Sequence, residues 1–416
     1  MKLLWLCNMM PGAVKEAITG SAASGGLWVD HVLHDLRKEA LTIHILCPGD
    51  GGRGRVDENC SYATFREGLP YVYLPELEET FRRELQAFRP DVIHIWGTEY
   101  GHTLAMVNGA EREGLLEHTV ASIQGLCSVY AGHYSEGVPE RVKRSFNLRD
   151  FLRRDNIRRQ EEKFALRGEL EVQALRKLRH VIGRTDWDRI CALRVNRKIQ
   201  YHFCNETLRQ PFYEGNWQYE TCRKHRIFAS SCVYPVKGFH YLLEAFGEVV
   251  KHYPDATLAV PGKSFVVRDL KGRLRQDGYH AYLHRLAKEY GVEDKIEFLG
   301  RLSAEGMKQA YLEANVFVLP STIENSPNSL GEAMLLGVPA VAADVGGVTD
   351  LMTHKKEGYV YQPSASYMLS GYIQQVFARE EQAEALGQAA KVHAAHTHDP
   401  GSNLQRLLEI YKTIQR

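Results

Sequence analysis

The fold is decided by a stretch that runs from a buried strand into a helix. Residues 314–334 read ANVFVLPSTIENSPNSLGEAM. The part Val316–Leu319 is short, apolar and rich in β-branched residues, which is typical of a fully buried strand in a parallel sheet. After a polar loop, Asn328 or Ser329 is a candidate N-cap, and the following helix is expected to end at Gly337–Pro339. The stretch therefore predicts one strand–loop–helix unit of an α/β sheet.

Two glutamates in this stretch suit a ligand with an anionic group and several hydroxyls. Glu324 falls in the predicted loop and Glu332 in the first turn of the predicted helix. Open parallel sheets bind ligands outside the carboxyl ends of their strands, where helix N-termini favour anions. A carboxylate at Glu332 can accept both hydrogens of a ribose diol, and Glu324 can reach sugar hydroxyls beyond a diphosphate. The alternative is that Glu332 complements the helix dipole and Glu324 is a solvated loop acid.

The order of these residues resembles a known family. The motif consists, in order, of a strand, Pro-Ser, a glutamate, seven residues, Glu-Ala-Met, Gly-Val-Pro and a strand that leads to Gly346-Gly347. It resembles the motif of the retaining glycosyltransferases of family 4, the glycosyl transferases group 1. The resemblance implies a two-domain GT-B enzyme in which Glu332 holds the ribose of a nucleotide sugar and Glu324 lies beside the donor sugar. The other residues of the motif that it places on the donor are Asn325, Ser326, Asn328, Ser329 and Leu330.

Length and composition are those of an ordinary globular protein with two domains. The chain has 416 residues, 44% of them hydrophobic and 25% charged, and a formal net charge of +1. This balance gives no support for nucleic-acid binding. No stretch approaches the roughly 20 apolar residues of a membrane span, and residues 1–7 are expected to form the first strand rather than a signal peptide. The eight cysteines contain no Cys-x-x-Cys pair, so we expect no zinc site, no disulfides and a cytoplasmic location.

Strand and helix patterns alternate in two successive sets, which predicts an α/β fold of two doubly wound, Rossmann-like domains. The predicted strands are 1–7, 41–47, 91–96, 120–123 and 181–183, and then 226–230, 257–260, 295–299, 316–319 and 340–343. Residues 206–220 lack a clear period and are the predicted linker. The N-terminal, acceptor-side domain is expected over 1–205 and the C-terminal, nucleotide-sugar-binding domain over 221–399. The resemblance implies that the domains face each other across a cleft and that residues 400–416 pack back on the first.

A second candidate for ligand contact follows the first strand of the second set. Residues 229–238 read ASSCVYPVKG and precede a predicted helix. At this position the ammonium group of Lys237 can stabilise the negative charge on a departing nucleoside diphosphate. The alternative is a surface lysine beside a turn glycine, Gly238.

This loop departs from the resembled family in one respect. The family carries Gly-Arg where this chain has Ser231-Cys232, which leaves the diphosphate one positive charge short. We expect hydroxyl and backbone donors of Ser230 and Ser231 to compensate, followed by Lys263, with Arg301 as a further alternative.

The first domain carries a short glycine-rich loop, GSAASGG at residues 20–26, before a predicted helix at 27–36. Small residues let a backbone approach a phosphate or a sugar closely. The loop is also compatible with a generic connection. Its position matches the Gly-Gly loop of the resembled family, which implies that Gly25 and Gly26 contact the donor.

Three side chains are candidates for the catalytic residue of the first domain. The resembled family often has a histidine after the fourth strand, where this chain has Gln124. A glutamine can hydrogen-bond a sugar hydroxyl but cannot take a proton, which suits a retaining mechanism in which the leaving phosphate accepts it. His133 and His102 are the alternatives, and His133 is preferred; each is also compatible with a structural role.

An Asp-x-Asp at Asp186 and Asp188 matches the pattern by which another glycosyltransferase fold chelates a divalent metal. Three residues match by chance easily, so we expect a metal-independent enzyme.

The region Arg141–Arg179 has 13 lysines and arginines against six acids. It is expected either to touch an anionic membrane or a lipid-linked acceptor, or to be a solvated helix.

These observations favour a retaining hexosyltransferase of polysaccharide biosynthesis that needs no cofactor. The donor is expected to be a UDP- or GDP-sugar and the acceptor a hydroxyl of a glycan or lipid-linked glycan, with the protein in the cytoplasm or on the inner face of the membrane. The alternatives are a GT-B sugar-nucleotide epimerase, a non-catalytic GT-B-like binding subunit and, with least support, a glycoside hydrolase, whose two carboxyls would flank a glycosidic bond.

Overall fold

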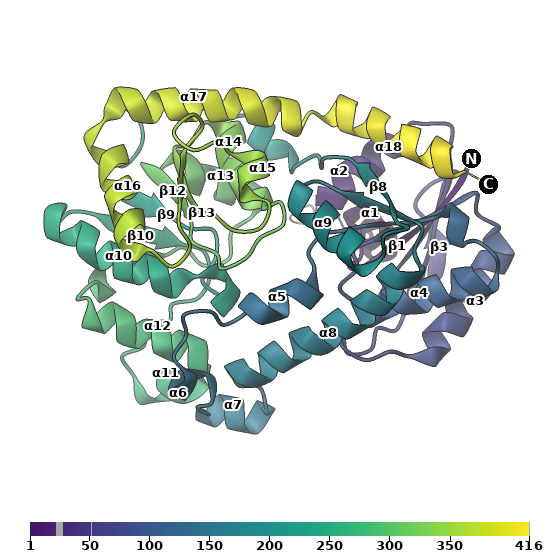
Figure 1. Cartoon of the computed structure of the whole chain (residues 1–416), viewed down its shortest axis with the longest axis horizontal. Helices are drawn as coiled ribbons and strands as arrows, with labels where there is room; N and C mark the ends of the chain where they lie inside the picture. The colour runs from purple at the N-terminus through teal and green to yellow at the C-terminus, as the bar shows by residue number, and fades with distance from the viewer. Residues whose placement is uncertain (22–27, 51, 416) are drawn as a thin grey trace. The chain divides into compact units, whose positions relative to one another are not determined.

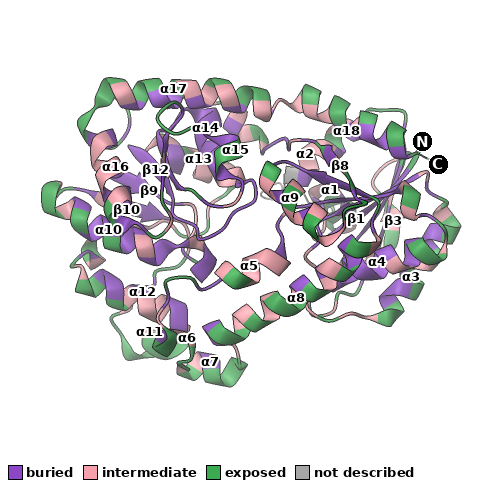
Figure 2. Cartoon of the chain, in the orientation of Figure 1, coloured by how far each residue is buried: buried purple, intermediate pink, exposed green. Residues whose placement is uncertain are grey.

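The computed structural model describes residues 1–21, 28–50 and 52–415, which divide into two compact units (Figure 1). Unit 1 comprises Met1–Ala131, Lys163–Arg209 and His398–Arg416. Unit 2 comprises Gly132–Glu162 and Gln210–Thr397. Each unit is built around one sheet, whose central strands are coloured as buried in Figure 2.

Within the described residues, the sheet of unit 1 has eight strands in the order β3-β4-β2-β1-β5-β6-β7-β8. The strands are β1 (Lys2–Cys7), β2 (Thr42–Pro48), β3 (Arg53–Arg55), β4 (Cys60–Phe65), β5 (Val92–Trp96), β6 (Thr119–Ser122), β7 (His180–Gly183) and β8 (Gln200–Phe203). β3 pairs antiparallel with β4, and the other neighbours pair in parallel.

Both faces of this sheet are covered, because alternate residues of β1 enter different cores. Leu4 and Leu6 lie in one hydrophobic cluster, and Leu3 and Trp5 lie in the other. This burial on two faces explains why the strands read as continuous apolar runs. The helices of unit 1 are α1 (Gly12–Thr19), α2 (Trp28–Leu36), α3 (Pro75–Phe88), α4 (Gly101–Arg112), η1 (Leu116–His118), α9 (Asp186–Val195) and α18 (Pro400–Ile414). α5 (Cys127–His133) and α8 (Ile157–Lys177) each contain a boundary between the units.

The C-terminal helix α18 is tied to the sheet of unit 1 by Tyr411. The indole Nε1 of Trp5 donates to the Tyr411 hydroxyl at 3.2 Å, and that hydroxyl lies 2.6 Å from Nδ1 of His94. Nε2 of His94 lies 2.7 Å from Oγ of Ser122. The hydroxyl of Tyr411 thus joins the indole of Trp5 to the imidazole of His94, which in turn contacts Ser122.

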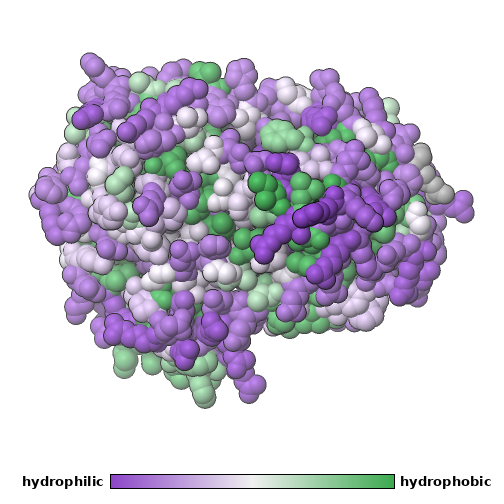
Figure 3. All heavy atoms as spheres, viewed as in Figure 1, coloured by the Kyte–Doolittle hydropathy of each residue, from purple (hydrophilic) through white to green (hydrophobic). Residues whose placement is uncertain are grey.

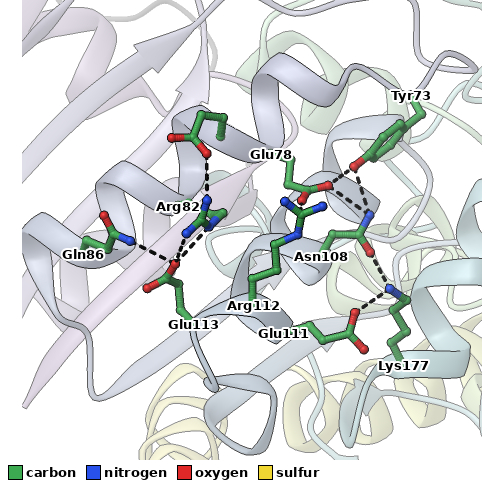
Figure 4. Close-up of polar contacts among 10 residues, drawn as sticks. Tyr73, Glu78, Arg82, Gln86, Asn108, Glu111, Arg112, Glu113 and Lys177 are labelled. Atoms are coloured by element: carbon green, nitrogen blue, oxygen red, sulfur yellow. Dashed lines mark hydrogen bonds and ion pairs between the residues drawn. The ribbon is translucent and has the colours of Figure 1, made fainter.

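A polar network joins α3, α4 and α8 on the outside of unit 1 (Figure 4). Nζ of Lys177 donates to Oδ1 of Asn108 at 2.8 Å and to Oε2 of Glu111 at 2.6 Å. Asn108 in turn donates to the Tyr73 hydroxyl at 3.0 Å and to Glu78 at 3.3 Å. The C-terminal end of α8 is therefore fixed to α4 by its own positive charge.

In the described part of unit 2, the sheet has six strands in the order β11-β10-β9-β12-β13-β14, all paired in parallel. The strands are β9 (Arg226–Phe228), β10 (Thr257–Val260), β11 (Ile296–Phe298), β12 (Val316–Leu319), β13 (Ala340–Ala343) and β14 (Tyr359–Tyr361). The helices are α6 (Glu140–Lys143), α7 (Leu148–Arg153), η2 (Gln210–Tyr213), η3 (Pro235–Lys237), α10 (Phe239–His252), α11 (Leu270–Arg275), α12 (Gly278–Glu289), η4 (Glu293–Lys295), α13 (Ala304–Leu312), α14 (Asn328–Leu336), α15 (Val348–Leu351), α16 (Ser366–Ala378) and α17 (Glu380–Thr397).

The predicted fold class, two doubly wound Rossmann-like α/β domains, is confirmed. All ten predicted strands are present within a few residues of their predicted ends. Four strands were not predicted, namely β3, β4, β8 and β14. β3 and β8 lie at sheet edges and contain exposed residues, so they lack the apolar run of a buried strand.

The division of the chain differs from the predicted boundaries of 1–205 and 221–399 in two places. Residues 132–162 belong to unit 2, where the carboxylate of Asp150 accepts from the backbone N–H of Gly278 at 2.7 Å. The predicted linker 206–220 is packed on unit 2 from Gln210 onward, because Trp217 is buried and its indole donates to the carbonyl of Ala314 at 2.7 Å. Residues 398–416 belong to unit 1.

The eight cysteines are free, and burial raises the pKa of each of their thiols above its ordinary value, which disfavours the reactive thiolate. Among the helices that the structure describes, none combines the length and the apolar character needed for a membrane span.

Candidate functional site

The strand order of unit 2 reverses direction between β9 and β12. From β9 the chain proceeds outward through β10 and β11, and from β12 it proceeds the other way through β13 and β14. The loops that leave the carboxyl ends of β9 and β12 therefore diverge, and such a switch point is where doubly wound sheets bind ligands. The first loop carries Lys237 and the second carries Glu324.

The structure brings these two predicted residues into direct contact. Nζ of Lys237 lies 2.6 Å from Oε1 of Glu324, and the hydroxyl of Ser321 donates to the same oxygen at 2.7 Å. The Glu324 side chain is 8% exposed, whereas that of Lys237 is 35% exposed. The buried carboxylate is thus neutralised, and the ammonium group remains open to solvent on one side. This geometry allows an incoming anion to share the lysine.

Two glycines allow the loops to approach each other. Gly238 has φ +62°, and a Cβ added there would lie 1.8 Å from the carbonyl oxygen of Pro320. Gly346 has φ +53°, and its added Cβ would lie 1.8 Å from the carbonyl oxygen of Glu324. Any larger residue at either position would push the Glu324 loop away.

The helix that follows this loop, α14, begins one residue earlier than the predicted N-cap allows. Its N-cap is Pro327, not Asn328 or Ser329, because the Pro327 carbonyl already accepts from the backbone N–H groups of Leu330 and Gly331 at 2.9 and 3.2 Å. Glu332 is therefore the fifth helical residue rather than part of the first turn. Its N-cap residue, Pro327, makes no side-chain cap hydrogen bond, and the start of a helix suits an anionic ligand.

The remaining predicted residues of this motif surround the helix start. Asn325, Ser326 and Glu332 are buried, and Leu330 is fully buried. Asn328 and Ser329 occupy the first two helical positions and are partly exposed. A buried carboxylate on a helix next to the switch point is a suitable acceptor for paired hydroxyls.

The loop after β9 has a neutral side chain where the resembled family has an arginine. Cys232 is 1% exposed, and burial raises the pKa of its thiol to about 12, so it supplies no charge. Ser230 and Ser231 are half-buried in this loop, and the Ser231 hydroxyl accepts from the backbone N–H of Val233 at 3.4 Å. Both hydroxyls can donate to a phosphate oxygen.

Two exposed cations follow the neighbouring strands. Lys263 lies after β10 and Arg301 after β11, and the backbone N–H of Gly262 donates to the carbonyl of Gly300 at 2.8 Å. This bridge holds the two loops together at the carboxyl end of the sheet. Either cation can replace the missing arginine.

His133 belongs to unit 2, although it was predicted in the first domain. Its backbone oxygen accepts from the Thr322 hydroxyl at 2.8 Å, next to the Glu324 loop. Its imidazole Nδ1 lies 2.9 Å from Oε2 of Glu136, so the ring is engaged at the surface. The structure therefore brings the His133 backbone, rather than its imidazole, to the predicted site.

Gln124 lies in unit 1 and is held by a buried ion pair. Its amide nitrogen donates to Oε1 of Glu206 at 2.5 Å, and Arg184 donates to Oε2 of the same glutamate at 2.5 Å. Gln124 therefore has a fixed orientation at the carboxyl end of β6. Gly25 and Gly26, the other predicted residues of the first domain, lie outside the described residues.

Unit 1 has its own switch point, between β1 and β5, and a pocket of about 150 Å³ lies there. Asn8, Glu99, Tyr100 and Gln124 contribute to its lining. The amide of Asn8 donates to Glu99 at 3.3 Å, and burial raises the pKa of the Glu99 carboxyl. Sequence reasoning missed Asn8, Glu99 and Tyr100, although their positions directly after predicted strands could have indicated them.

The Asp-x-Asp pair has a structural role. The side chain of Thr185 accepts from the backbone N–H of Asp188, and the Asp188 carboxylate accepts in return, which forms a capping box for α9. Asp186 pairs with Arg189 on the same helix at 2.6 Å. In the described parts of the chain, no group of three or more His, Cys, Asp or Glu side chains is arranged to hold a metal ion.

Comparison with known proteins connects unit 2 to a family. Residues 223–393 match the model of the family described as glycosyl transferases group 1. A D-inositol 3-phosphate glycosyltransferase of Corynebacterium urealyticum is 26% identical over 184 residues, 43% of this chain and 41% of the relative. The chain spans 29% to 41% of the length of three curated relatives it matches.

Two solved structures share the fold over the whole chain. Sucrose-phosphate synthase of Thermosynechococcus elongatus has a TM-score of 0.73 at 16% identity and covers 100% of this chain and 99% of its own. Anabaena HepE in complex with UDP-glucose has a TM-score of 0.67 at 17% identity and covers 99% of this chain and 100% of its own.

Proposed function

Because residues 223–393 belong to the glycosyl transferases group 1, we propose that this protein is a retaining glycosyltransferase that moves a sugar from a nucleoside diphosphate sugar to a hydroxyl group. The observation that carries the proposal is the ion pair of Lys237 and Glu324 at the switch point of unit 2. A paired cation and carboxylate at this place suit a ligand with both an anionic group and hydroxyls.

The donor would lie along the carboxyl end of the unit 2 sheet. Its diphosphate meets the start of α14 and the ammonium group of Lys237, with Ser230, Ser231 and Lys263 as further donors. The carboxylate of Glu332 accepts the ribose hydroxyls, and Glu324 accepts hydroxyls of the transferred sugar. In this arrangement Lys237 has a stronger interaction with the departing diphosphate than with the intact donor, because negative charge grows there as the glycosidic bond breaks.

The proton of the acceptor hydroxyl would pass to the leaving diphosphate. Gln124 has no proton-accepting nitrogen, and the imidazole of His133 is paired with Glu136. A phosphate oxygen next to the broken bond is the base that remains, which delivers the acceptor from the same side and retains the configuration. The residues of the unit 1 pocket are the candidates for holding the acceptor.

The proposed donor is a UDP- or GDP-sugar, and the proposed acceptor is a glycan or lipid-linked glycan. HepE, which shares the fold, is known in complex with UDP-glucose. No metal and no cofactor enter the proposed mechanism. A lipid-linked acceptor lies at a membrane, so the proposal includes a peripheral contact of the Arg141–Arg179 region with the anionic inner face of the membrane.

A thermal-shift panel of UDP-, GDP- and ADP-sugars tests the proposal. A ligand that binds only the folded protein at about 100 times its Kd stabilises it by about 2.7 kcal/mol. We expect one class of nucleotide sugar to raise the Tm, and Glu332→Gln to abolish that rise. Glu305→Gln, an exposed glutamate on α13, is the matched control. If no nucleotide sugar raises the Tm or is consumed, the proposal is wrong, and conversion of the donor to its epimer without acceptor would identify an epimerase.

A further inference from the structure

A surface of unit 2 that the proposed donor site does not use combines exposed apolar side chains with positive charge. It is formed by α6, α7, α11 and α12 and is called the α7–α11 surface here. On it, Phe151 and Leu152 of α7 are 69% and 73% exposed, and Leu270 of α11 is 74% exposed. The further exposed hydrophobic residues of this surface are Phe146, Leu148 and Leu274. Figure 3 shows hydrophobic side chains beside hydrophilic ones along the lower left edge of the molecule, where Figure 2 places α7 and α11.

This exposure is not a sign of a loose segment, because the inner side of α7 is anchored. Asp150 is 1% exposed and accepts from the backbone N–H of Gly278, the first residue of α12, at 2.7 Å. Asn147, directly before α7, donates to the carbonyl of Gln276 at 3.3 Å. With α7 held through Asp150 and Asn147, Phe151 and Leu152 are presented outward from a fixed helix.

Positive charge surrounds these apolar residues. Arg153, Lys271 and Arg275 are exposed and have no ion-pair partner among the described residues. A groove of about 670 Å³ adjoins α7 and α11. The cations that line it are Arg141, Arg273, Arg285 and Lys288, and no carboxylate contributes to its lining. The groove thus presents several cations to one anionic group.

Most acids of these helices are used within the protein. Asp269 and Asp277 accept from backbone N–H groups and cap α11 and α12, and Glu140 pairs with Lys143 and Arg144. Glu289, the last residue of α12, is exposed. The surface therefore keeps its net positive charge.

Three cations of the C-terminal part of the basic stretch make contacts within unit 1. Lys177 donates to Asn108 and Glu111 (Figure 4), and Arg179 pairs with Glu117 at 3.0 Å. The guanidinium of Arg167 donates to the carbonyl of Glu99 at 2.8 Å and lies over the ring of Tyr100. These three cations are therefore engaged within unit 1, whereas Arg141 and Arg153 of the N-terminal part are exposed on unit 2.

We propose that the α7–α11 surface docks on an anionic phospholipid bilayer. Phe151, Leu152 and Leu270 insert between the lipid headgroups, and the cations around them contact lipid phosphates, one of which enters the groove. An apolar cluster without the cations would fit a protein partner equally well, and cations alone would fit a free anion. The combination on neighbouring short helices fits the interface of a charged bilayer, where apolar and anionic layers lie next to each other. This inference extends the membrane contact in the proposed function, but it does not involve the donor site.

Sedimentation of the full chain with lipid vesicles tests the inference. We expect binding to vesicles of phosphatidylcholine mixed with phosphatidylglycerol, weaker binding at high salt, and little binding to pure phosphatidylcholine. The double variant Phe151→Ser with Leu152→Ser is expected to lower the partition constant about tenfold, because both side chains lose their contact with the acyl boundary. Arg153→Glu and Lys271→Glu are each expected to lower it about fivefold or more.

Two control variants match these changes in exposure. Ile190→Ser on α9 removes a large apolar residue that is 54% exposed, and Lys251→Glu on α10 reverses an exposed cation of unit 2. Both are expected to leave vesicle binding unchanged. Equal binding to neutral and anionic vesicles, or no loss of binding in the Phe151 and Leu152 double variant, would overturn the inference. If soluble inorganic phosphate abolishes vesicle binding at constant ionic strength, the groove is a site for a free anion instead.

The same variants separate this inference from the proposed function. Stabilisation by a nucleotide sugar depends on Glu332 and is expected to be unchanged in all α7–α11 surface variants. If a surface variant loses vesicle binding but still binds the donor, the membrane surface is supported. If the original chain binds the donor but no vesicles, the membrane inference is wrong and the glycosyltransferase proposal stands.

Discussion

At the scale of single residues, the contact of Lys237 with Glu324 is expected to contribute to stability and to catalysis in different ways. The ammonium group neutralises a carboxylate that is almost buried, and the Ser321 hydroxyl is the second group that holds it. Lys237→Gln is expected to lower kcat for sugar transfer about 100-fold or more, because one charge that stabilises the leaving diphosphate is lost. Its free energy of unfolding should fall by about 1–3 kcal/mol, because Glu324 loses its partner.

Steady-state transfer kinetics and urea unfolding measure the two effects of Lys237→Gln. Lys251→Gln, an exposed lysine on α10, is the control and should change kcat and stability very little. A Lys237→Gln variant with unchanged kcat would contradict the role of this lysine, whatever its stability.

Gly238 offers a test of the close approach between the two loops. Gly238→Ala is expected to destabilise the protein by more than about 2 kcal/mol, because it adds a clash with Pro320 to the cost of about 1–2 kcal/mol for an L-residue with positive φ. Gly291→Ala is the matched control, since Gly291 has φ +66° and an added Cβ there meets nothing within 4 Å. Urea unfolding of both variants isolates the clash, and equal losses would show that the loops can separate without cost.

At the scale of the elements, α18 depends on the hydrogen bonds of Tyr411. Tyr411→Phe keeps the ring in the core but leaves the Trp5 indole N–H and Nδ1 of His94 without this partner. Each buried group left unsatisfied costs about 1–3 kcal/mol, so we expect a loss of at least that size in the free energy of unfolding. Tyr367→Phe on α16, where the side chain is 72% exposed, should change stability by less than about 0.5 kcal/mol. Thermal unfolding compares them, and equal Tm values would rule out this role of Tyr411.

At the scale of the whole molecule, buried histidines make stability depend on pH. Burial lowers the pKa of His94 and His102 to about 3 and that of His240 to about 4, against about 6.5 in an unfolded chain. Below pH 6.5 the unfolded chain binds protons that the folded protein does not, so stability is fully present above pH 6.5 and falls as the pH drops. Each such histidine contributes up to about 1.4 kcal/mol per pH unit in that window.

Glu171 opposes this dependence. Burial raises its pKa from 4.5 to about 7, so the folded protein binds a proton that the unfolded chain lacks between these values, and its contribution is lost as the pH rises through 7. Among the described residues, six histidines have a lowered pKa and four acids have a raised one, so we expect net destabilisation between pH 6.5 and 4.5. The histidines are His94, His102, His180, His202, His240 and His354, and the acids are Glu67, Glu99, Asp150 and Glu171. Urea unfolding over this range measures the effect. Glu171→Gln should steepen the fall, and stability that stays constant from pH 6.5 to 4.5 would contradict the burial of neutral histidines.

The two alternating sets of strands and helices, and the places of Lys237 and Glu324 in loops that follow strands, could be predicted from the sequence alone. These features depend on local patterns, because a strand buried on both faces is an apolar run and a loop at its carboxyl end directly follows it in the chain. The short edge strand β8, which has exposed residues, gives no such pattern and was not predicted.

Only the tertiary structure decided which distant segments share a surface. Residues 132–162 lie in unit 2 because Asp150 meets the start of α12, 128 residues away in the sequence. The same kind of long-range contact pairs Lys237 with Glu324 and Gln124 with Glu206. Spacing along the chain cannot specify such contacts, since they are fixed by the packing of elements that are far apart in sequence.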